Sequence, residues 1–234
     1  MEIIRGCELG VQGQYGEIHL LGLWLPRHSA PLDAELARLR GHREERNLKI
    51  LDRLRSIGIN IGYQEVLDEA GGESVGRPHI ARVLQKRGIV SNFVQAFELY
   101  LGYYGAAYVP RTLLTPEEGV SLMADLGAVV SFAHPMLIRC PPSWFDEIIP
   151  RLKEAGLGAI EAYHSEHSAR DERFCVELAA RYGLGLSGGS DYHGMAKPGV
   201  ELGRGKGGLR VTVALLDALK ARRKRPVDDA PEVL

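Results

Sequence analysis

The chain has 234 residues, which is long enough for one large domain or for a domain with an inserted subdomain. Hydrophobic residues make up 45% and charged residues 25%, a composition that predicts an ordinary soluble globular protein. The formal net charge of -1 excludes a global electrostatic attraction to nucleic acid or to membrane surfaces. An anionic substrate would therefore have to be held by a local cluster of residues.

The cysteines and the apolar runs predict a cytoplasmic protein without a membrane partner. Three cysteines (Cys7, Cys140 and Cys175) are odd in number and far apart, so they form neither a disulfide framework nor a zinc ribbon. No apolar run reaches the length needed to span a bilayer. The first residues, Met-Glu-Ile-Ile-Arg-Gly, lack the pattern of a signal peptide.

The second half of the chain has the pattern of an α/β fold. Residues 128–133 (AVVSFA) form a short and nearly all-apolar run, as expected of a buried parallel strand. A helix is predicted before it, because Thr115 can act as the N-cap, Pro116 suits the first helical position and Glu118 completes a capping box. Gly127 is expected to end that helix.

The same unit then repeats. A helix is expected over 144–155, which Pro150 must kink or divide into two pieces. Residues 158–163 (GAIEAY) form the next predicted strand, Ser168 opens a further helix, and a third strand begins over 184–187. Alternation of strands and helices with short loops implies parallel strands and crossover helices.

The region over 31–102 differs, because its leucines and isoleucines recur at helical spacing. We therefore predict an α/β domain formed by 1–30 and 103–220, interrupted by an all-helical insertion over 31–102. The segment 17–25 before the insertion is strand-like. Residues 221–234 are basic and then acidic with prolines, and we expect a flexible, solvated tail there, not a nucleic-acid patch.

Histidine and acidic side chains gather where the predicted strands end. In parallel α/β folds the carboxyl ends of the strands meet at one edge, so residues far apart in sequence can converge there. Such side chains, without matching cysteine pairs, suit Mn, Zn or Fe with open positions for substrate and water. The candidate ligands are Glu8, which follows Ile3 and Ile4, His19 on the next strand, His134, Asp191 and His193.

Each of these residues has a plainer alternative when taken alone. His134 before Pro135 can be a turn residue, Asp191 can be a helix cap, His193 can be a surface residue, and Glu8 can be an exposed charge at a strand end. Together the five residues are stronger evidence for a metal site than any one of them, because all of them lie near the ends of successive predicted strands. His164 and His167 are equally compatible with supporting the ligands and with mere exposure, and His28 and His42 are expected on the surface.

Several motifs together resemble the polymerase-and-histidinol-phosphatase (PHP) superfamily of phosphoesterases, over nearly the whole chain up to about residue 220. The motifs are Gly6-Cys7-Glu8, EIHLLG at 17–22, Ala133-His134-Pro135, IEAY at 160–163 and GSDYHG at 189–194. The insertion, with GRPH at 76–79 and YVPR at 108–111, is similar to the branch that dephosphorylates nucleotides and degrades short RNA from the 5′ end.

The resemblance implies a distorted seven-stranded α/β barrel that holds two or three divalent ions. It implies that Glu8, His19, His134, Asp191 and His193 are ligands, with Asp191 and His193 central to catalysis. Family metals bind phosphate oxygens and activate water for attack on phosphorus, which agrees with the general ability of divalent cations to lower the pKa of water and to neutralise developing charge.

A bound phosphate also needs cationic partners. Arg43 and Arg46 lie three residues apart at the start of an expected helix and share one face, and the plainer alternative is a solvated surface. Arg77 and His79 flank a proline at another helix start, where backbone N–H groups favour an anion, and the alternative is helix capping. The full expected substrate-binding set is Arg43, Arg46, Arg77, His79, Arg111 and Lys197.

The sequence departs from the family pattern at one point. The family begins with a strand bearing His-x-His and a nearby Asp, followed by a strand ending in Thr-Asp-His, and neither motif occurs in the 234 residues. The departure is compatible with a misassigned start, a gene fragment, or a branch that works differently. Five ligands are expected to hold one ion, so we expect this chain to bind fewer metals and to hydrolyse phosphomonoesters poorly.

The sequence therefore predicts a metal-dependent phosphoesterase. Its expected substrates are nucleotides or the 5′ ends of short oligonucleotides, without stable binding of duplex nucleic acid. One alternative is a truncated and inactive remnant of a PHP barrel that only binds a partner. Another is a module associated with a polymerase, which the lack of a polymerase-sized extension disfavours.

Overall fold

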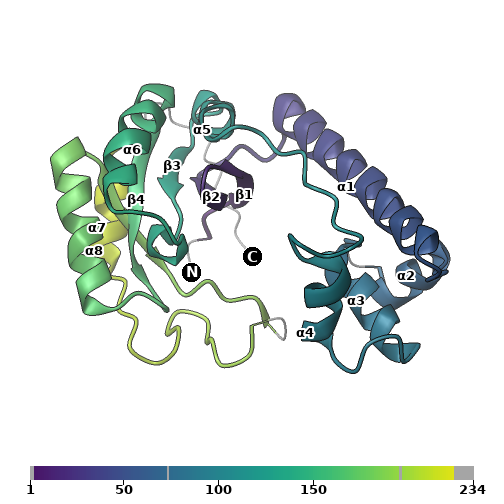
Figure 1. The fold of residues 1–234 in the computed structure, drawn as a ribbon. Helices are drawn as coiled ribbons and strands as arrows, with labels where there is room; N and C mark the ends of the chain where they lie inside the picture. The colour runs from purple at the N-terminus through teal and green to yellow at the C-terminus, as the bar shows by residue number, and fades with distance from the viewer. Residues whose placement is uncertain (1–2, 73, 195–196, 224–234) are drawn as a thin grey trace. The chain divides into compact units, whose positions relative to one another are not determined.

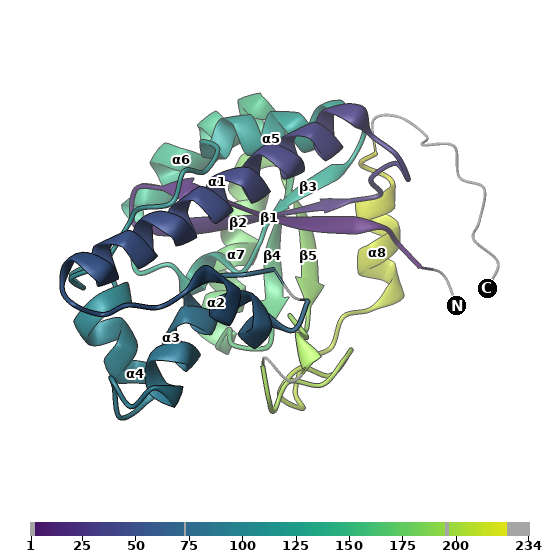
Figure 2. The ribbon, with the colours of Figure 1, turned by 90° about the vertical axis from the view of Figure 1, so that its right-hand side faces the viewer.

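The computed structural model describes residues 3–72, 74–194 and 197–223 (Figures 1 and 2). The chain folds into two compact units. Unit 1 comprises Met1–Leu32 with Leu113–Leu234, and unit 2 comprises Asp33–Thr112. Among the described residues, no helix is both long and apolar enough to cross a membrane.

Unit 1 is built on one mixed five-stranded sheet with the order β1-β2-β3-β4-β5. The first three strands pair antiparallel, and β3, β4 and β5 are parallel, as the repeated strand–helix pattern predicted. The strands are β1 (Gly6–Gly13), β2 (Gly16–Leu23), β3 (Val129–Phe132), β4 (Leu157–His164) and β5 (Gly185–Gly189). The α/β class is confirmed, although the strands that the structure describes number five and not the seven of a complete PHP barrel.

Helices cover the sheet of unit 1 (Figure 2). Helix α5 packs on β1, β2 and β3, α6 packs on β4, α7 packs on β4 and β5, and α8 packs on β5. Their bounds are α5 (Pro116–Asp125), α6 (Ser143–Ala155), α7 (Ala169–Tyr182) and α8 (Val213–Lys220). Capping boxes open two of them: Thr115 pairs with Glu118 at α5, and Ser168 pairs with Asp171 at α7.

The β1–β2 hairpin is amphipathic with the period of two that a strand imposes. Leu9 and Val11 of β1 and Ile18 and Leu20 of β2 are buried. They face α5, where Gly119 lets the hairpin approach closely. The alternate positions, which include Glu8 and His19, therefore point to the opposite face of the hairpin.

Unit 2 is all helical and has its own apolar core, formed by residues such as Ile50, Leu54, Ile80 and Leu84. Its elements are α1 (Ala30–Ser56), which begins in unit 1, α2 (Tyr63–Ala70), α3 (Arg77–Lys86), α4 (Phe93–Ala96) and the π-helical turn η1 (Phe97–Leu101). Helices α1 and α3 each bury several apolar residues in this core, which explains why the leucines and isoleucines recur at helical spacing.

Four local predictions need correction or lie beyond the described chain. Pro150 does not divide α6, which runs as one helix, so of the two expected effects only a kink stays a prediction. Glu8 lies inside β1 and does not follow a strand at Ile3 and Ile4. Strand β2 carries His19 and runs antiparallel to β3. Arg43 and Arg46 lie in the middle of α1, because that helix begins at Ala30. Most of the predicted tail, residues 224–234, lies outside the described residues.

The packing of α5 on the hairpin can be tested at one glycine. A Cβ on Gly119 would lie 2.6 Å from Val11 Cγ1 and 3.1 Å from Leu20 Cδ1. We expect Gly119→Ala to lower the melting temperature by about 2–5 °C, because overpacking outweighs the gain in helix propensity. Gly41→Ala is the matched control, since nothing lies within 4 Å of its Cβ, and we expect a rise of about 1–3 °C. Equal shifts would contradict tight packing at Gly119.

Candidate metal and phosphate site

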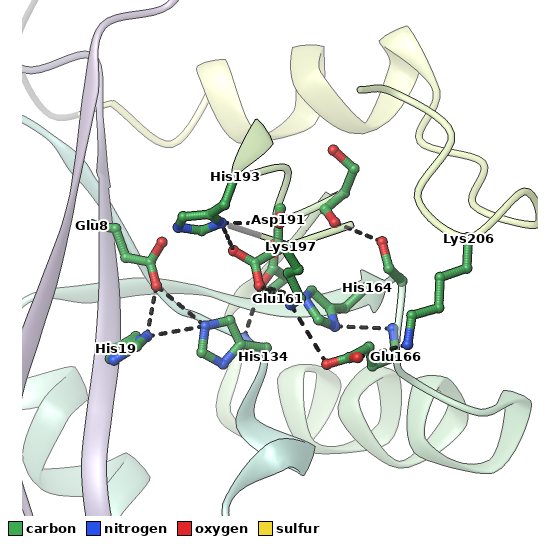
Figure 3. Close-up of polar contacts among 12 residues, drawn as sticks. Glu8, His19, His134, Glu161, His164, Glu166, Asp191, His193, Lys197 and Lys206 are labelled. Atoms are coloured by element: carbon green, nitrogen blue, oxygen red, sulfur yellow. Dashed lines mark hydrogen bonds and ion pairs between the residues drawn. The ribbon is translucent and has the colours of Figure 1, made fainter. Parts of the chain in front are cut away.

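Three potential metal ligands meet on the face of the β1–β2 hairpin that points away from α5. Glu8 on β1 and His19 on β2 are diagonal neighbours on the same face, and His19 Nδ1 lies 2.7 Å from Glu8 Oε1. His134 Nε2 lies 3.3 Å from Glu8 Oε1 and 3.3 Å from His19 Nδ1. Figure 3 shows the three side chains pointing toward one another. They form the first group of donor atoms close enough to share a metal ion.

The loop after β5 brings two further donors to the same place. Asp191 and His193 form a second potential metal-binding group with Glu8, with donor atoms within 4.8 Å of one another. His193 Nδ1 lies 3.1 Å from Asp191 Oδ1. The structure thus brings together all five side chains expected as ligands, and Glu8 belongs to both groups (Figure 3).

The backbone of two of these residues is strained. Among the described non-glycine residues, positive φ occurs at Trp24, at His134 (29°) and at Asp191 (53°). Such conformations cost free energy and persist where the surrounding structure fixes them. At His134 the turn is held by the 3₁₀ helix η2 (Pro135–Leu137) and by the Leu137 N–H, which donates to the His134 carbonyl at 3.1 Å. Strain therefore falls on two of the five candidate ligands.

A buried carboxylate and a buried imidazole support the donors from β4. The His134 backbone N–H donates to Glu161 Oε2 at 2.8 Å, and Glu161 is buried. His164, also buried, has its Nε2 3.5 Å from Asp191 Oδ2, beyond a well-formed hydrogen bond. Burial raises the pKa of Glu161 to about 7 and lowers the pKa of His164 to about 4. Both residues therefore lie directly behind candidate ligands and help to hold them in place.

Lys197 completes the charged cluster on the side of Asp191. Its Nζ donates to Asp191 Oδ2 at 2.5 Å and lies 3.6 Å from Glu166 Oε2. Lys206 Nζ pairs with the same glutamate at 2.7 Å (Figure 3). Burial opposes ionisation of Asp191, but the hydrogen bond and charge of Lys197 keep the pKa of Asp191 below its usual range. The lysine thus lies where it can meet both a ligand carboxylate and an anion.

The protonation of the first group reflects the two carboxylates beside His19, which are Glu8 and Glu17. Hydrogen bonds from His134 and His19 lower the pKa of Glu8. Hydrogen bonds to Glu17 and Glu8 raise the pKa of His19 to about 9. The cluster attracts positive charge, which protons on the imidazole supply in the absence of another cation.

The donors fit a divalent cation. Imidazole nitrogens and carboxylate oxygens are the ligands that Zn, Mn and Fe take in catalytic sites with open positions. Glu161 accepts a hydrogen bond from the backbone N–H of His134. A contact of this kind behind a metal ligand fixes the orientation of the ligand. The arrangement could hold a cation between Glu8, His19 and His134, or between Glu8, Asp191 and His193.

The other expected phosphate contacts lie in unit 2, where four of them have a hydrogen bond within the unit. Arg43 Nη1 donates to Ser74 Oγ at 2.7 Å, and the buried Arg46 donates from Nε to the Val109 carbonyl at 2.7 Å. Arg77 Nη1 donates to the Leu101 carbonyl at 2.9 Å. His79 accepts the Gly76 N–H at 3.1 Å, which is the helix-capping alternative for this histidine. Arg111 also lies in unit 2 and is partly exposed.

Two supporting residues were not assigned a role from sequence. Glu161 is a carboxylate inside an otherwise apolar strand, and that contrast was a usable signal. Glu166 follows β4 in a loop, and its pairing with Lys197 and Lys206 depends on segments 31 and 40 residues away. No local pattern in the sequence predicts that pairing.

The chain is similar to known proteins that act on phosphate esters. A 5′–3′ exoribonuclease of Haemophilus influenzae is 29% identical over 193 residues, covering 82% of this chain and 70% of the relative. A 3′,5′-nucleoside bisphosphate phosphatase of Chromobacterium violaceum is 26% identical over 226 residues, covering 96% and 79%. The crystal structure of a candidate metal-dependent phosphoesterase from Bifidobacterium adolescentis aligns with a TM-score of 0.75 at 25% identity, covering 95% and 77%.

No family model matches the chain. The named relatives and the structural neighbour nevertheless support a PHP-like phosphoesterase relationship, which is what the sequence motifs predicted.

The contact between Lys197 and Asp191 makes a testable prediction about metal binding. Lys197 occupies a ligand oxygen and places a positive charge beside the cation position. We expect Lys197→Met to bind Mn²⁺ about three- to ten-fold more tightly in calorimetry, because one competing like charge is removed. Lys206→Met, which removes the outer partner of Glu166, is the control and should bind like the wild type. Weaker binding by Lys197→Met would show that the lysine orients Asp191 for the metal.

Proposed function

We propose that this chain is a metal-dependent phosphomonoesterase of the PHP type that acts on nucleotides or on the 5′ ends of short oligonucleotides. The observation that carries the proposal is the sharing of Glu8 by two groups of donors, one with His19 and His134 and one with Asp191 and His193. Each group brings carboxylate and imidazole donor atoms from separate segments of the chain within 4.8 Å of one another.

The five side chains would hold the cation. When bound, a divalent ion supplies Lewis-acid stabilisation of charge on the phosphoryl group and activation of water. Two residues position the candidate ligands. Glu161 orients His134 by accepting a hydrogen bond from the His134 backbone N–H, and Lys197 provides a positive charge beside Asp191. We assign the catalytic role to Asp191 and His193, which lie on the loop after β5.

In unit 1, the phosphate is proposed to contact Lys197, which lies beside Asp191. Arginine side chains suit phosphate because their donors are planar and can bind two oxygens at once. In unit 2, the sequence predicts Arg43, Arg46 and Arg77 as phosphate contacts, and the structure gives each of them a hydrogen bond within that unit. His79 and Arg111 are the other residues of unit 2 that the sequence predicts to bind phosphate.

The class of substrate is proposed from two relatives. One is named a 5′–3′ exoribonuclease and the other a 3′,5′-nucleoside bisphosphate phosphatase. Both names describe cleavage of a phosphate ester on a nucleotide. A net charge of -1 gives the chain no overall attraction to a duplex, so we propose a mononucleotide or a short single strand as the substrate.

A second candidate is a protein that binds phosphorylated ligands without turning them over. The same donors could hold a cation, and Lys197 could hold an anion, without any turnover. Metal content and turnover distinguish the two candidates.

Activity and metal content should depend on the same aspartate. We expect about one Mn²⁺ per chain, because adjacent cations repel and five ligands offset little of that repulsion. We expect slow release of inorganic phosphate from adenosine 3′,5′-bisphosphate that requires Mn²⁺ and stops with a chelator. Asp191→Asn should reduce this rate at least about 100-fold, a typical loss for a group that acts at the reacting atoms.

Asp146→Asn is the matched control, because Asp146 pairs with Arg181 and Tyr182 on the outside of unit 1. It should retain both the metal and the rate. Metal binding without any phosphate release from the wild-type chain would favour the binding protein, and equal rates in Asp191→Asn would contradict the proposed site.

A further inference from the structure

A pocket of about 340 Å³ adjoins the first group of donors within unit 1, a size suited to a small ligand. Its lining includes His19 and His134, so any ligand in the pocket touches the proposed metal site directly. The other lining residues come from the tip of the β1–β2 hairpin and from the segment that follows β3: Tyr15, Gly16, Glu17, Leu137, Ile138 and Arg139.

The hairpin tip presents an aromatic ring in a fixed position. Tyr15 lies in the two-residue turn between β1 and β2, which Gly16 closes with φ of 124°. The Tyr15 ring packs edge-to-face on Trp144 with 5.6 Å between ring centroids. Trp144 is itself buried and packs on Phe132 and Phe145. The ring is thus anchored on one side while 41% of Tyr15 stays exposed.

The lining residues that follow β3 are also held in place by backbone contacts. Leu137 and Ile138 lie on and after the 3₁₀ turn η2 that starts beyond His134, and the Ile138 N–H donates to the Pro135 carbonyl at 3.2 Å. Leu137 is 42% exposed, so its side chain is accessible to a ligand in the pocket. An aromatic ring and aliphatic side chains together form a surface suited to a flat apolar group.

The charges of the lining select the kind of ligand. Glu17 is directed toward His19, with 3.6 Å between Oε1 and Nε2. Among the lining residues, Arg139 is the one that carries a permanent positive charge, and it is exposed. A ligand with a flat base and a phosphate separate from the one at the metal matches this combination of ring and guanidinium.

We propose that this pocket is the nucleoside subsite of the enzyme, with the base against Tyr15 and the phosphate that is not cleaved at Arg139. The inference rests on the proposed function and adds the residues that select a nucleotide over other phosphate esters. Stacking of a base on an aromatic side chain is tolerant of sequence, so the subsite should accept several bases. Arg139 should favour a bisphosphate over a monophosphate.

Calorimetric titration with two probes tests the subsite without requiring turnover. Adenosine 3′,5′-bisphosphate carries base and second phosphate, and ribose 5-phosphate carries neither. We expect the wild type to prefer the bisphosphate, and we expect Tyr15→Ala to reduce the ratio of the two affinities about ten-fold, within the range for loss of base stacking. Tyr15→Phe keeps the ring and should restore the ratio.

The second arm separates the phosphate contact from the base contact. Arg139→Met should reduce the preference for adenosine 3′,5′-bisphosphate over adenosine 5′-monophosphate about ten-fold, and Arg139→Lys should retain part of it. Equal affinity of the wild type for all three probes, or ratios unchanged in Tyr15→Ala and Arg139→Met, would overturn the subsite. Nucleotide binding of the expected pattern without phosphate release would instead leave the subsite standing and contradict the proposed function.

Discussion

The carboxylate of Glu8 is the interaction on which the candidate site depends. Its Oε1 lies within 3.3 Å of ring nitrogens from both His19 and His134, and the same side chain forms a second group with Asp191 and His193. Acids gathered at one point repel each other unless positive charge lies between them. Here the raised pKa of His19 keeps its imidazole protonated, and this positive charge and the ammonium of Lys197 offset the negative charge of the carboxylates. A divalent cation could take the place of the proton on the imidazole.

The register of the sheet brings these groups together. Antiparallel pairing places His19 opposite Gly10 and beside the end of β3, where the Ala133 N–H donates to the His19 carbonyl at 3.0 Å. Parallel pairing of β3, β4 and β5 brings His134, His164 and the loop of Asp191 to the same edge. A shift of one residue in β1 would turn Glu8 toward α5 and bury it among apolar side chains. Packing of the hairpin on α5 therefore also fixes the chemistry.

Local signals were enough to predict the repeating units of the α/β fold. The capping boxes at Thr115 and Ser168 and the apolar runs of β3 and β4 act over a few residues, so their meaning can be read without tertiary context. The reversed direction of β2 and the placement of Glu8 inside β1 were not predicted, because strand pairing depends on partners distant in sequence. The contacts of Arg46 with Val109 and of Lys197 with Asp191 are likewise tertiary.

The positive φ angles at His134 and Asp191 indicate that the backbone is strained at two candidate metal ligands, which follow β3 and β5 respectively.

The most direct test of the proposed metal site is anomalous diffraction at the manganese edge from crystals soaked in Mn²⁺. The account predicts a peak within coordination distance of the Glu8 carboxylate, shared with His134 or with Asp191. A manganese peak bound elsewhere, with Glu8 still bonded only to His19 and His134, would contradict it.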